Sequence, residues 1–192
     1  MKSAEPSKIL ITTSRNPTQM MRTFCNDLAR SIPRSMRINR GKSSLDTLAE
    51  KALEHEAEKV IICDRWKGGL GKLHLFELGS SGLVQFYPLM CVRKVKLQKT
   101  FGYVRSKAAK SLILQTESGI SFEARKLADI LSHFFNIPKL TSDETLSPNT
   151  QAAMDISLNA ARRIQITFLQ TPRKIEIGPR ITISYLTWRP RK

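Results

Sequence analysis

One segment of the chain interleaves basic side chains with aromatic rings and holds no acid. Within Val92–Lys110 the residues are, in order, Arg93, Lys94, Lys96, Lys99, Phe101, Tyr103, Arg105, Lys107 and Lys110. Cations pair with phosphates while Phe and Tyr rings stack on bases, so this pattern is typical of a surface for single-stranded or irregular RNA. The alternative is a solvated linker with Phe101 packed into the core.

A second candidate anion site lies where a strand gives way to a helix. The stretch Ser14–Thr18 (SRNPT) follows the apolar run Ile9–Thr13. Free backbone N–H groups and the positive end of a helix dipole favour an anion there, and Arg15 adds a fork of donors. We expect an RNA phosphate to lie against Ser14, Arg15 and Thr18. Simple helix capping, with Arg15 in solvent, is the alternative.

A third candidate is Arg180, at the end of Ile177–Arg180 (IGPR). Gly and Pro can form a tight bend that fixes the direction of the next side chain. Arg180 would then meet a phosphate with little loss of side-chain entropy. The alternative is an internal ion pair with Glu176.

Residue patterns typical of an enzyme are missing. The three histidines, His55, His74 and His133, have no metal-ligand spacing with a cysteine, and no G-x-S-x-G or H-E-x-x-H motif occurs. Lys67–Lys72 (KGGLGK) is not a Walker motif, because the G-x-x-x-x-G-K-[ST] spacing is absent and the residues that follow, up to His74, include no Ser or Thr. The stretch also precedes a strand, whereas a Walker loop precedes a helix. We therefore predict a turn there, and a protein without catalytic residues, metal ligands or cofactor.

The charge of the chain is strongly positive and unevenly distributed. The formal net charge is +16, with 32 Lys and Arg against 16 Asp and Glu. Residues 1–45 hold nine basic groups and two acids, residues 78–116 hold seven and none, and residues 156–192 hold eight and one. Three basic zones separated by balanced stretches indicate one face that meets a polyanion. A generally basic proteome is the alternative.

Composition limits the class of protein. A chain of 192 residues with 41% hydrophobic residues can form one large domain or two small ones. No apolar run approaches the roughly 20 residues of a membrane helix, and the first residues lack the apolar core of a signal peptide, so we expect no membrane partner. The odd, widely spaced Cys25, Cys63 and Cys91 indicate reduced thiols in an intracellular protein.

Hydrophobic periodicity predicts the elements that position these residues. We expect helices at about 17–30, 44–54, 122–135 and 150–162, and strands at 8–13, 34–38, 59–63, 72–78, 83–87, 111–116, 164–169, 174–177 and 180–188. The buried stripe of the first helix is predicted to include Met20, and that of the second Leu45 and Leu53. Alternation of helices and strands predicts an α/β fold with mixed sheets.

The same order of elements recurs about 104 residues apart. Ile9–Ser14 aligns with Ile113–Ser118, and Leu45–Val60 with Asn149–Ile164. We therefore expect two similar β-α-β-α-β-β half-domains, residues 1–104 and 105–192, that face one another. The cleft or continuous face between them is the predicted place of function.

Four blocks of the sequence resemble the signature blocks of the Brix-domain family. They are Ile9–Pro17 (ILITTSRNP), Arg37–Leu45 (RINRGKSSL), Val60–Gly69 (VIICDRWKGG) and Glu176–Thr182 (EIGPRIT). Matching positions are Ser14, Arg15 and Pro17 in the first block, Asn39, Arg40 and Gly41 in the second, and Gly178, Pro179 and Arg180 in the last. Gly79–Gly82 (GSSG) departs from the G-P-T-A stretch of many members, so contacts there are in doubt.

The resemblance implies a fold of two halves, each similar to the anticodon-binding domain of class IIa aminoacyl-tRNA synthetases. It implies a non-catalytic factor for ribosome biogenesis that binds rRNA or pre-rRNA, similar to the compact archaeal form of the small-subunit processome member. A guide RNA and other ribosome-assembly proteins are candidate further partners. We add Arg37, Asn39, Arg40 and Lys42 to the predicted RNA-binding residues. The location expected is the cytoplasm, or the nucleolus for a eukaryotic source. A tRNA-binding accessory module is the alternative function.

Overall fold

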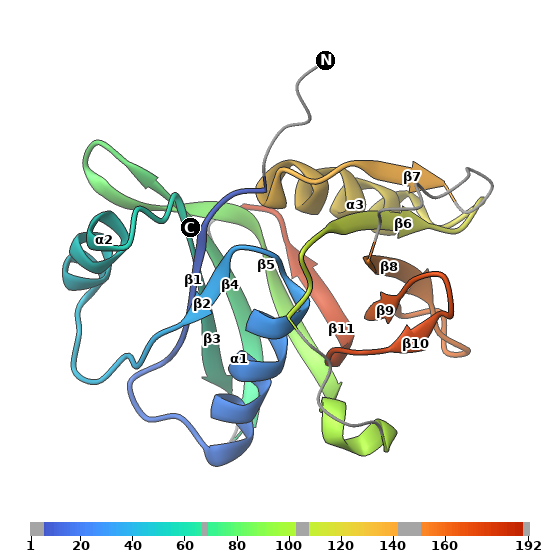
Figure 1. Cartoon of the computed structure of the whole chain (residues 1–192), viewed down its shortest axis with the longest axis horizontal. Helices are drawn as coiled ribbons and strands as arrows, with labels where there is room; N and C mark the ends of the chain where they lie inside the picture. Colours follow the sequence, from blue (N-terminus) through green and yellow to red (C-terminus); the bar gives the residue numbers. More distant parts are fainter. Residues whose placement is uncertain (1–5, 67–68, 103–107, 142–150, 190–192) are drawn as a thin grey trace.

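One mixed sheet organises the chain (Figure 1). The computed structural model describes residues 6–66, 69–102, 108–141 and 151–189. Within these residues the sheet has eleven strands in the order β2-β1-β3-β4-β5-β11-β9-β8-β6-β7, with β10 beside β9. The elements are β1 (Ile9–Thr13), α1 (Gln19–Ser31), β2 (Ser35–Arg37), α2 (Leu45–Glu54), β3 (Lys59–Trp66), β4 (Gly69–Gly79), β5 (Gly82–Lys96), the 3-10 helix η1 (Gln98–Phe101), β6 (Leu112–Thr116), α3 (Phe122–Phe135), β7 (Lys139–Thr141), β8 (Ala152–Leu158), β9 (Ile164–Gln170), β10 (Ile175–Glu176) and β11 (Arg180–Thr187). The predicted α/β class is confirmed.

The two halves of the chain join edge to edge in the sheet and contribute residues to one shared core. β1 pairs in parallel with β2 and β3, and β6 pairs in parallel with β7 and β8, as expected of strands joined through crossovers. The halves meet where β5 and β11 pair antiparallel, from Arg180 opposite Lys96 to Thr187 opposite Leu89. The sheet is therefore continuous from one half to the other. The sequence predicted either a cleft or a continuous face between the halves, and the sheet has the continuous face. The predicted boundary at 104/105 lies outside the described residues.

Local sequence accounts for most of the elements. Each α-helix begins after a hydroxyl side chain that accepts from a backbone N–H: Thr18 from Met21, Ser44 from Thr47 and Ser121 from Ala124. α3 ends at Asn136, whose left-handed conformation suits asparagine. Of the glycine-rich stretch, residues 69–72 already belong to β4, which pairs antiparallel with β3, and residues 67 and 68 lie outside the described residues, so the predicted turn stays a prediction.

The helix predicted at residues 150–162 is wrong. Ala152–Leu158 is strand β8, held between β6 and β9. Its apolar residues alternate with period two, and Ala152, Met154 and Ile156 are fully buried on one face. The turn that follows is held by the side chain of Asn159, which accepts from the backbone N–H of Ala161 and Arg163, each at 3.0 Å. The proposed alignment of this stretch with α2 therefore fails, and a duplicated origin of the halves stays a prediction.

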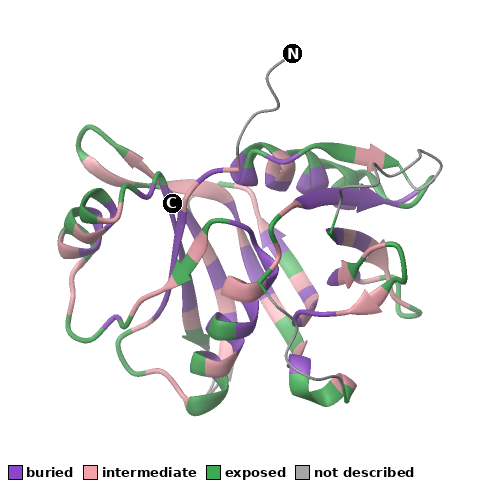
Figure 2. Cartoon of the chain, viewed as in Figure 1, coloured by how far each residue is buried: buried purple, intermediate pink, exposed green. Residues whose placement is uncertain are grey.

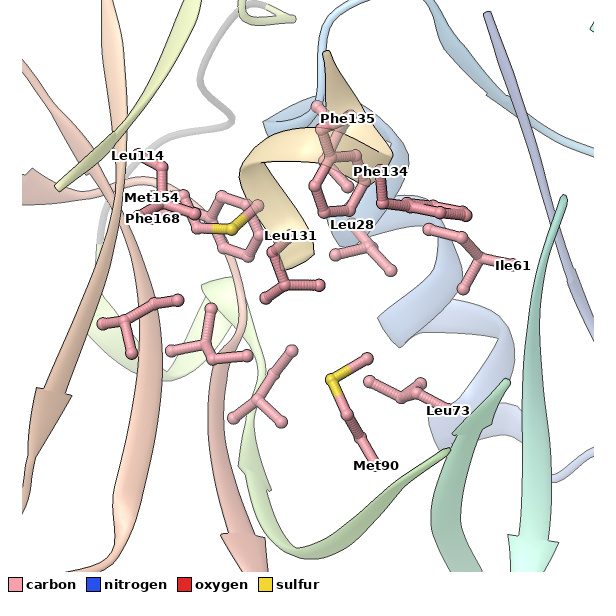
Figure 3. Packing of buried hydrophobic residues seen from close by; sticks show 14 of the residues in the cluster. Leu28, Ile61, Leu73, Met90, Leu114, Leu131, Phe134, Phe135, Met154 and Phe168 are labelled. Atoms are coloured by element: carbon pink, nitrogen blue, oxygen red, sulfur yellow. The ribbon is translucent and has the colours of Figure 1, made fainter. Parts of the chain in front are cut away.

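The main core lies between one face of the sheet and the helices α1 and α3. Phe24 and Leu28 of α1, and Leu131 and Phe134 of α3, belong to a single cluster with strand residues of both halves (Figure 3). Burial is concentrated on the strands and on the sheet-facing sides of these helices (Figure 2). Because both halves contribute to one cluster, this sheet and its two helices form one cooperative core.

A smaller core lies on the opposite face of the sheet, under α2. Its members are Leu10, Leu48, Ala52, Ala57, Val60, Ile62 and Phe76. Three residues predicted to be buried are exposed instead: Met20 by 41%, Leu45 by 43% and Leu53 by 66%. A helix of ten residues that rests on one face of a sheet cannot bury its end residues as well as its centre. The exposed Leu45 becomes relevant below.

One polar contact of a buried charge ties the halves together, and another joins two segments of the first half. Lys59 of β3 is buried, and its Nζ donates to the backbone oxygen of Phe134 at 2.6 Å, at the C-terminal end of α3. Asp27 of α1 is buried, and its carboxylate accepts from the backbone N–H of Gln98 at 3.0 Å. A cation at a helix C-terminus and a carboxylate on a backbone N–H are both favourable arrangements.

Candidate nucleic-acid interface

A cleft opens on the α2 face of the sheet, where the parallel strands β1 and β3 end. It has a volume of about 530 Å³. Its walls are Ser14, Arg15, Arg40, Leu45, Ile62, Asp64, His74, Phe76 and Gln85. In open α/β sheets, ligands bind beyond the carboxyl ends of the parallel strands, which is the position of this cleft. Three of the residues predicted from sequence, Ser14, Arg15 and Arg40, meet here.

Two arginines make one side of the cleft positive. Arg15 is exposed, whereas Arg40 is 9% exposed and donates from Nε to the backbone oxygen of Ser43 at 2.8 Å. Burial lowers the pKa of the Arg40 guanidinium below its usual value, the nearby charge of Arg15 adds to this effect, and Asp64 opposes it. Two guanidinium groups this close repel one another, and an anion between them would relieve that repulsion.

Polar groups on β3 and β4 line the facing side. His74 Nε2 lies 3.6 Å from Asp64 Oδ2, too long for a good hydrogen bond, and the backbone N–H of Arg65 donates to Asp64 Oδ1 at 2.7 Å. The contact with His74 lowers the pKa of Asp64, and burial opposes this. Ser14 Oγ is buried and lies close enough to Asp64 to help lower the pKa of that carboxyl. Ser14 Oγ makes no hydrogen bond of good geometry within the described chain.

The beginning of α1 provides a further positive region beside Arg15. Thr18 caps the helix, and no acidic residue occupies its first turn. The first turns of α2 and α3, in contrast, contain Asp46 and Glu123, which already balance the positive ends of their dipoles. Of the three α-helices described, α1 is therefore the one whose start can best accept an external anion.

The other predicted RNA-binding residues of the second sequence block do not line the cleft. Arg37 donates from Nη2 to Asn39 Oδ1 at 2.8 Å and from Nη1 to Asn26 Oδ1 at 3.4 Å. Its Nε is buried and finds no acceptor in the described ranges. Asn39 and Lys42 are exposed. Arg37 pairs with Ile11, a residue of the main core, and contacts Asn26 of α1, so it lies on the face opposite the cleft.

The basic strand residues occupy the same face of the sheet as the cleft. Asp64 pairs with Lys72 and Lys72 with Cys91, so these three residues lie on the α2 face. Lys94 is three residues further along β5, beyond a β-bulge, and pairs with Thr182, which lies between the core residues Ile181 and Ile183 and therefore points to the same α2 face. The separation from Asp64 to Lys94 is thus roughly 10–15 Å, from about 4.8 Å per strand and 3.3 Å per residue. Across the sheet, Lys94 is opposite Thr182, which is opposite Gln165, which is opposite Ser157.

This row across β5, β11, β9 and β8 is polar throughout, and we call it the polar row. Lys96 is two residues further along β5 and therefore lies on the same face as Lys94. Arg93 is exposed and sits beside a β-bulge, and Lys99 is exposed on η1. Tyr103, Arg105 and Lys107 lie outside the described residues.

Arg180 forms the internal ion pair that the sequence left as the alternative. Its guanidinium binds the Glu176 carboxylate through two hydrogen bonds, and it lies over the Phe101 ring, 5.1 Å from the ring centre. Phe101 is thus engaged by Arg180 and is not a free stacking platform. These contacts favour a structural role for the Gly178–Arg180 block, and its RNA contact is not supported by the geometry.

Gly178 has a structural role that follows from its surroundings. A Cβ at this position would lie 2.1 Å from Ser31 Oγ and 2.8 Å from Phe168 Cβ. Only glycine lets the segment between β10 and β11 approach the end of α1 this closely. The block therefore joins the second half to the first.

Sequence reasoning missed Asp64, His74 and Gln85, which complete the cleft. The period-two alternation of β3 does place Ile62 and Asp64 on one face, but only the pairing of Ile62 with His74 brings the histidine beside them. It also missed an aromatic group on α3, where Lys126 lies 4.3 Å from the centre of the Trp188 ring and Phe122 is 80% exposed.

Three further observations concern metal ligands, thiols and membrane-spanning helices among the described residues. No group of three His, Cys, Asp or Glu side chains is arranged to hold a metal there. Cys25, Cys63 and Cys91 are free and buried, and burial raises the pKa of the Cys63 thiol. Within the same ranges, no helix combines the length and the apolar character needed to cross a membrane.

Known proteins with similar sequence or structure share one description. No protein-family model matches the chain. A probable Brix domain-containing ribosomal biogenesis protein of Pyrococcus horikoshii is 34% identical over 100 residues, which are 50% of this chain and 42% of that protein. The chain therefore spans about half the length of some of the curated relatives that it matches. A protein of the same description from Methanococcus maripaludis is 30% identical over 132 residues, 67% of this chain and 77% of that protein.

A solved structure shows the same fold. The crystal structure of a probable ribosomal biogenesis protein from Aeropyrum pernix K1 superposes with a TM-score of 0.78, at 21% identity, over 97% of this chain and 98% of that one. The 30% identity to the M. maripaludis relative, 77% of whose length is covered, decides the family. The chain belongs to the family of Brix domain-containing ribosomal biogenesis proteins.

Proposed function

We propose that this chain is a non-catalytic ribosome-assembly factor that binds rRNA or pre-rRNA. One observation carries the proposal: the arginine-lined cleft and the lysines of β5 lie on the same face of one continuous sheet. The net charge of +16 favours a polyanionic partner, and the description of its relatives as ribosomal biogenesis proteins supports RNA of the ribosome as that partner.

The RNA backbone is proposed to run from Arg15 across the sheet to the polar row. One phosphate binds at Arg15 and the start of α1, with Arg40 behind it. The next contacts are Lys94 and Lys96, with Arg93 and Lys99 at the margin. Thr182, Gln165 and Ser157 then offer neutral donors and acceptors along the sheet. Such a path fixes the RNA mostly through its backbone, which suits a scaffold or chaperone for irregular rRNA.

The experiment measures binding of an rRNA fragment at several salt concentrations. The affinity of the unaltered chain should fall with salt, with a log–log slope of about −0.7 for each phosphate contact on a single strand. The double substitution Lys94→Ala with Lys96→Ala should weaken binding and reduce the steepness of the slope. Arg125→Ala with Arg162→Ala removes two exposed charges from other elements and serves as the matched control. An unchanged slope in the first variant would place the RNA elsewhere.

Arg15→Ala tests the other end of the path. Because Arg15 is exposed and has no carboxylate partner in the described structure, its loss should change the free energy of unfolding by less than about 0.5 kcal/mol. Loss of a charge-assisted bond to phosphate should cost roughly 1.5–3 kcal/mol of binding free energy. A tRNA competitor in the same assay distinguishes an rRNA factor from a tRNA-binding module, because stronger binding of tRNA would contradict the proposal.

A further inference from the structure

The cleft is larger and more apolar than a phosphate site requires. Leu45, Ile62 and Phe76 form its apolar wall, and Leu45 is 43% exposed. A phosphate needs donors and positive charge, and apolar side chains do not bind it. A volume of about 530 Å³ lies in the range of about 300–1,000 Å³ typical of pockets for small organic ligands. Something flat and partly apolar would fill this space better than a phosphate alone.

One side of the cleft is aromatic. The rings of His74 and Phe76 are stacked, with centres 6.2 Å apart and planes inclined by 15°. Two rings in nearly parallel planes present a surface on which a nucleobase can stack, and stacking tolerates all four bases. The amide of Gln85 lies beside the ring, with its Nε2 3.5 Å from His74 Nδ1.

The polar groups of the cleft suit the edge of a base. Gln85 has a donor and an acceptor, Asp64 has carboxylate oxygens, and the buried Ser14 hydroxyl has no hydrogen-bond partner of good geometry within the described residues. Ser14 and Asp64 both line the cleft, so a base edge held there can contact the two groups together. Arg15 is on the same wall as Ser14 and can hold the phosphate attached to the base.

We propose that the cleft holds one unstacked nucleotide of an RNA loop or bulge. Its base lies against Leu45, Ile62 and the rings of His74 and Phe76, and its phosphate lies at Arg15. This inference rests on the proposed function, because the nucleotide belongs to the RNA that crosses the sheet. It adds that the chain selects RNA with an extruded base over regular duplex.

The test compares two RNA hairpins that differ by one base. The first has a single bulged nucleotide, and the second has an abasic residue at that bulge, so both have the same phosphates. The unaltered chain should bind the first hairpin more tightly, by roughly 5- to 100-fold, if one base stacks in the cleft. This comparison needs no altered protein and is unaffected by folding.

Leu45→Ala locates the base in the cleft. The substitution removes part of the apolar wall and should reduce the preference for the bulged base by roughly fivefold, since the side chain is about half exposed without ligand. Affinity for the abasic hairpin should stay unchanged. Leu53→Ala is the matched control, because Leu53 lies on the same helix, is 66% exposed and does not line the cleft.

The outcomes separate this inference from the proposed function. If both hairpins bind equally, with an affinity that falls with salt, RNA binding stands and the nucleotide pocket is refuted. If the preference exists but Leu45→Ala does not reduce it, the base is bound elsewhere and the pocket is again refuted. If neither hairpin nor any rRNA fragment binds, the proposed function fails as well.

Discussion

Replacing Gly178 by alanine should destabilise the chain by preventing the close approach of its two halves. The added Cβ would lie 2.1 Å from Ser31 Oγ, 2.8 Å from Phe168 Cβ and 3.0 Å from Ser31 Cβ. Rotation of the Ser31 side chain can move Oγ, but the two Cβ atoms are fixed by the backbones of α1 and β9. The end of α1 must therefore move away from the segment that precedes β11.

The size of the effect follows from this geometry. Forcing extra atoms into a packed core costs about 1–3 kcal/mol. For a chain of this length each kcal/mol corresponds to about 2–4 °C in the melting temperature, so a loss of 2 kcal/mol predicts a fall of about 4–8 °C. Adding Ser31→Ala should recover part of the loss, because it removes the nearest atom and leaves the clash with Phe168.

Urea unfolding followed by circular dichroism measures the change. Gly79→Ala is the control, since its Cβ would meet Val84 Cγ2 at an ordinary 3.4 Å, and its free energy of unfolding should stay within about 0.5 kcal/mol of the unaltered chain. An equally small change for Gly178→Ala would refute the reasoning. So would normal stability combined with weakened RNA binding, because Gly178 would then be part of an RNA contact.

Two further predictions concern the buried charged residues Lys59 and Asp27. Lys59→Met should reduce the free energy of unfolding by about 1–3 kcal/mol, because the backbone oxygen of Phe134 loses a charged donor; an unchanged urea midpoint would contradict this. Burial raises the pKa of Asp27 above its usual 3.8, against the opposing hydrogen bond from Gln98. The folded state thus holds this proton more tightly, and the contribution of Asp27 to stability decreases as the pH rises from 3.8 through the folded pKa. Asp27→Asn should accordingly become more favourable relative to the unaltered chain toward neutral pH, as measured by urea unfolding across that range; a pH-independent difference would count against it.

The local pattern of the sequence was enough to predict most elements and part of the site. Continuous apolar runs predicted β1, β3 and β6, because strands buried on both faces need no polar residues. Hydrophobic periodicity predicted α1, α2 and α3. Ser14 and Arg15 were predicted to meet an anion because a strand end followed by a helix start is a local feature.

Only the tertiary structure decided where these elements bury their residues and which distant side chains meet. The stretch around Met154 has alanines that favour a helix, but pairing with β6 on one side and β9 on the other made it a strand. Exposure of Leu45 depends on how far α2 extends beyond the sheet. The neighbours of Arg180 and of Gly178 come from α1, η1, β9 and β10, and a periodicity of a few residues carries no information about contacts over such separations. The cleft itself exists because β4 places His74 beside Ile62 and Asp64, and α2 places Leu45 opposite them.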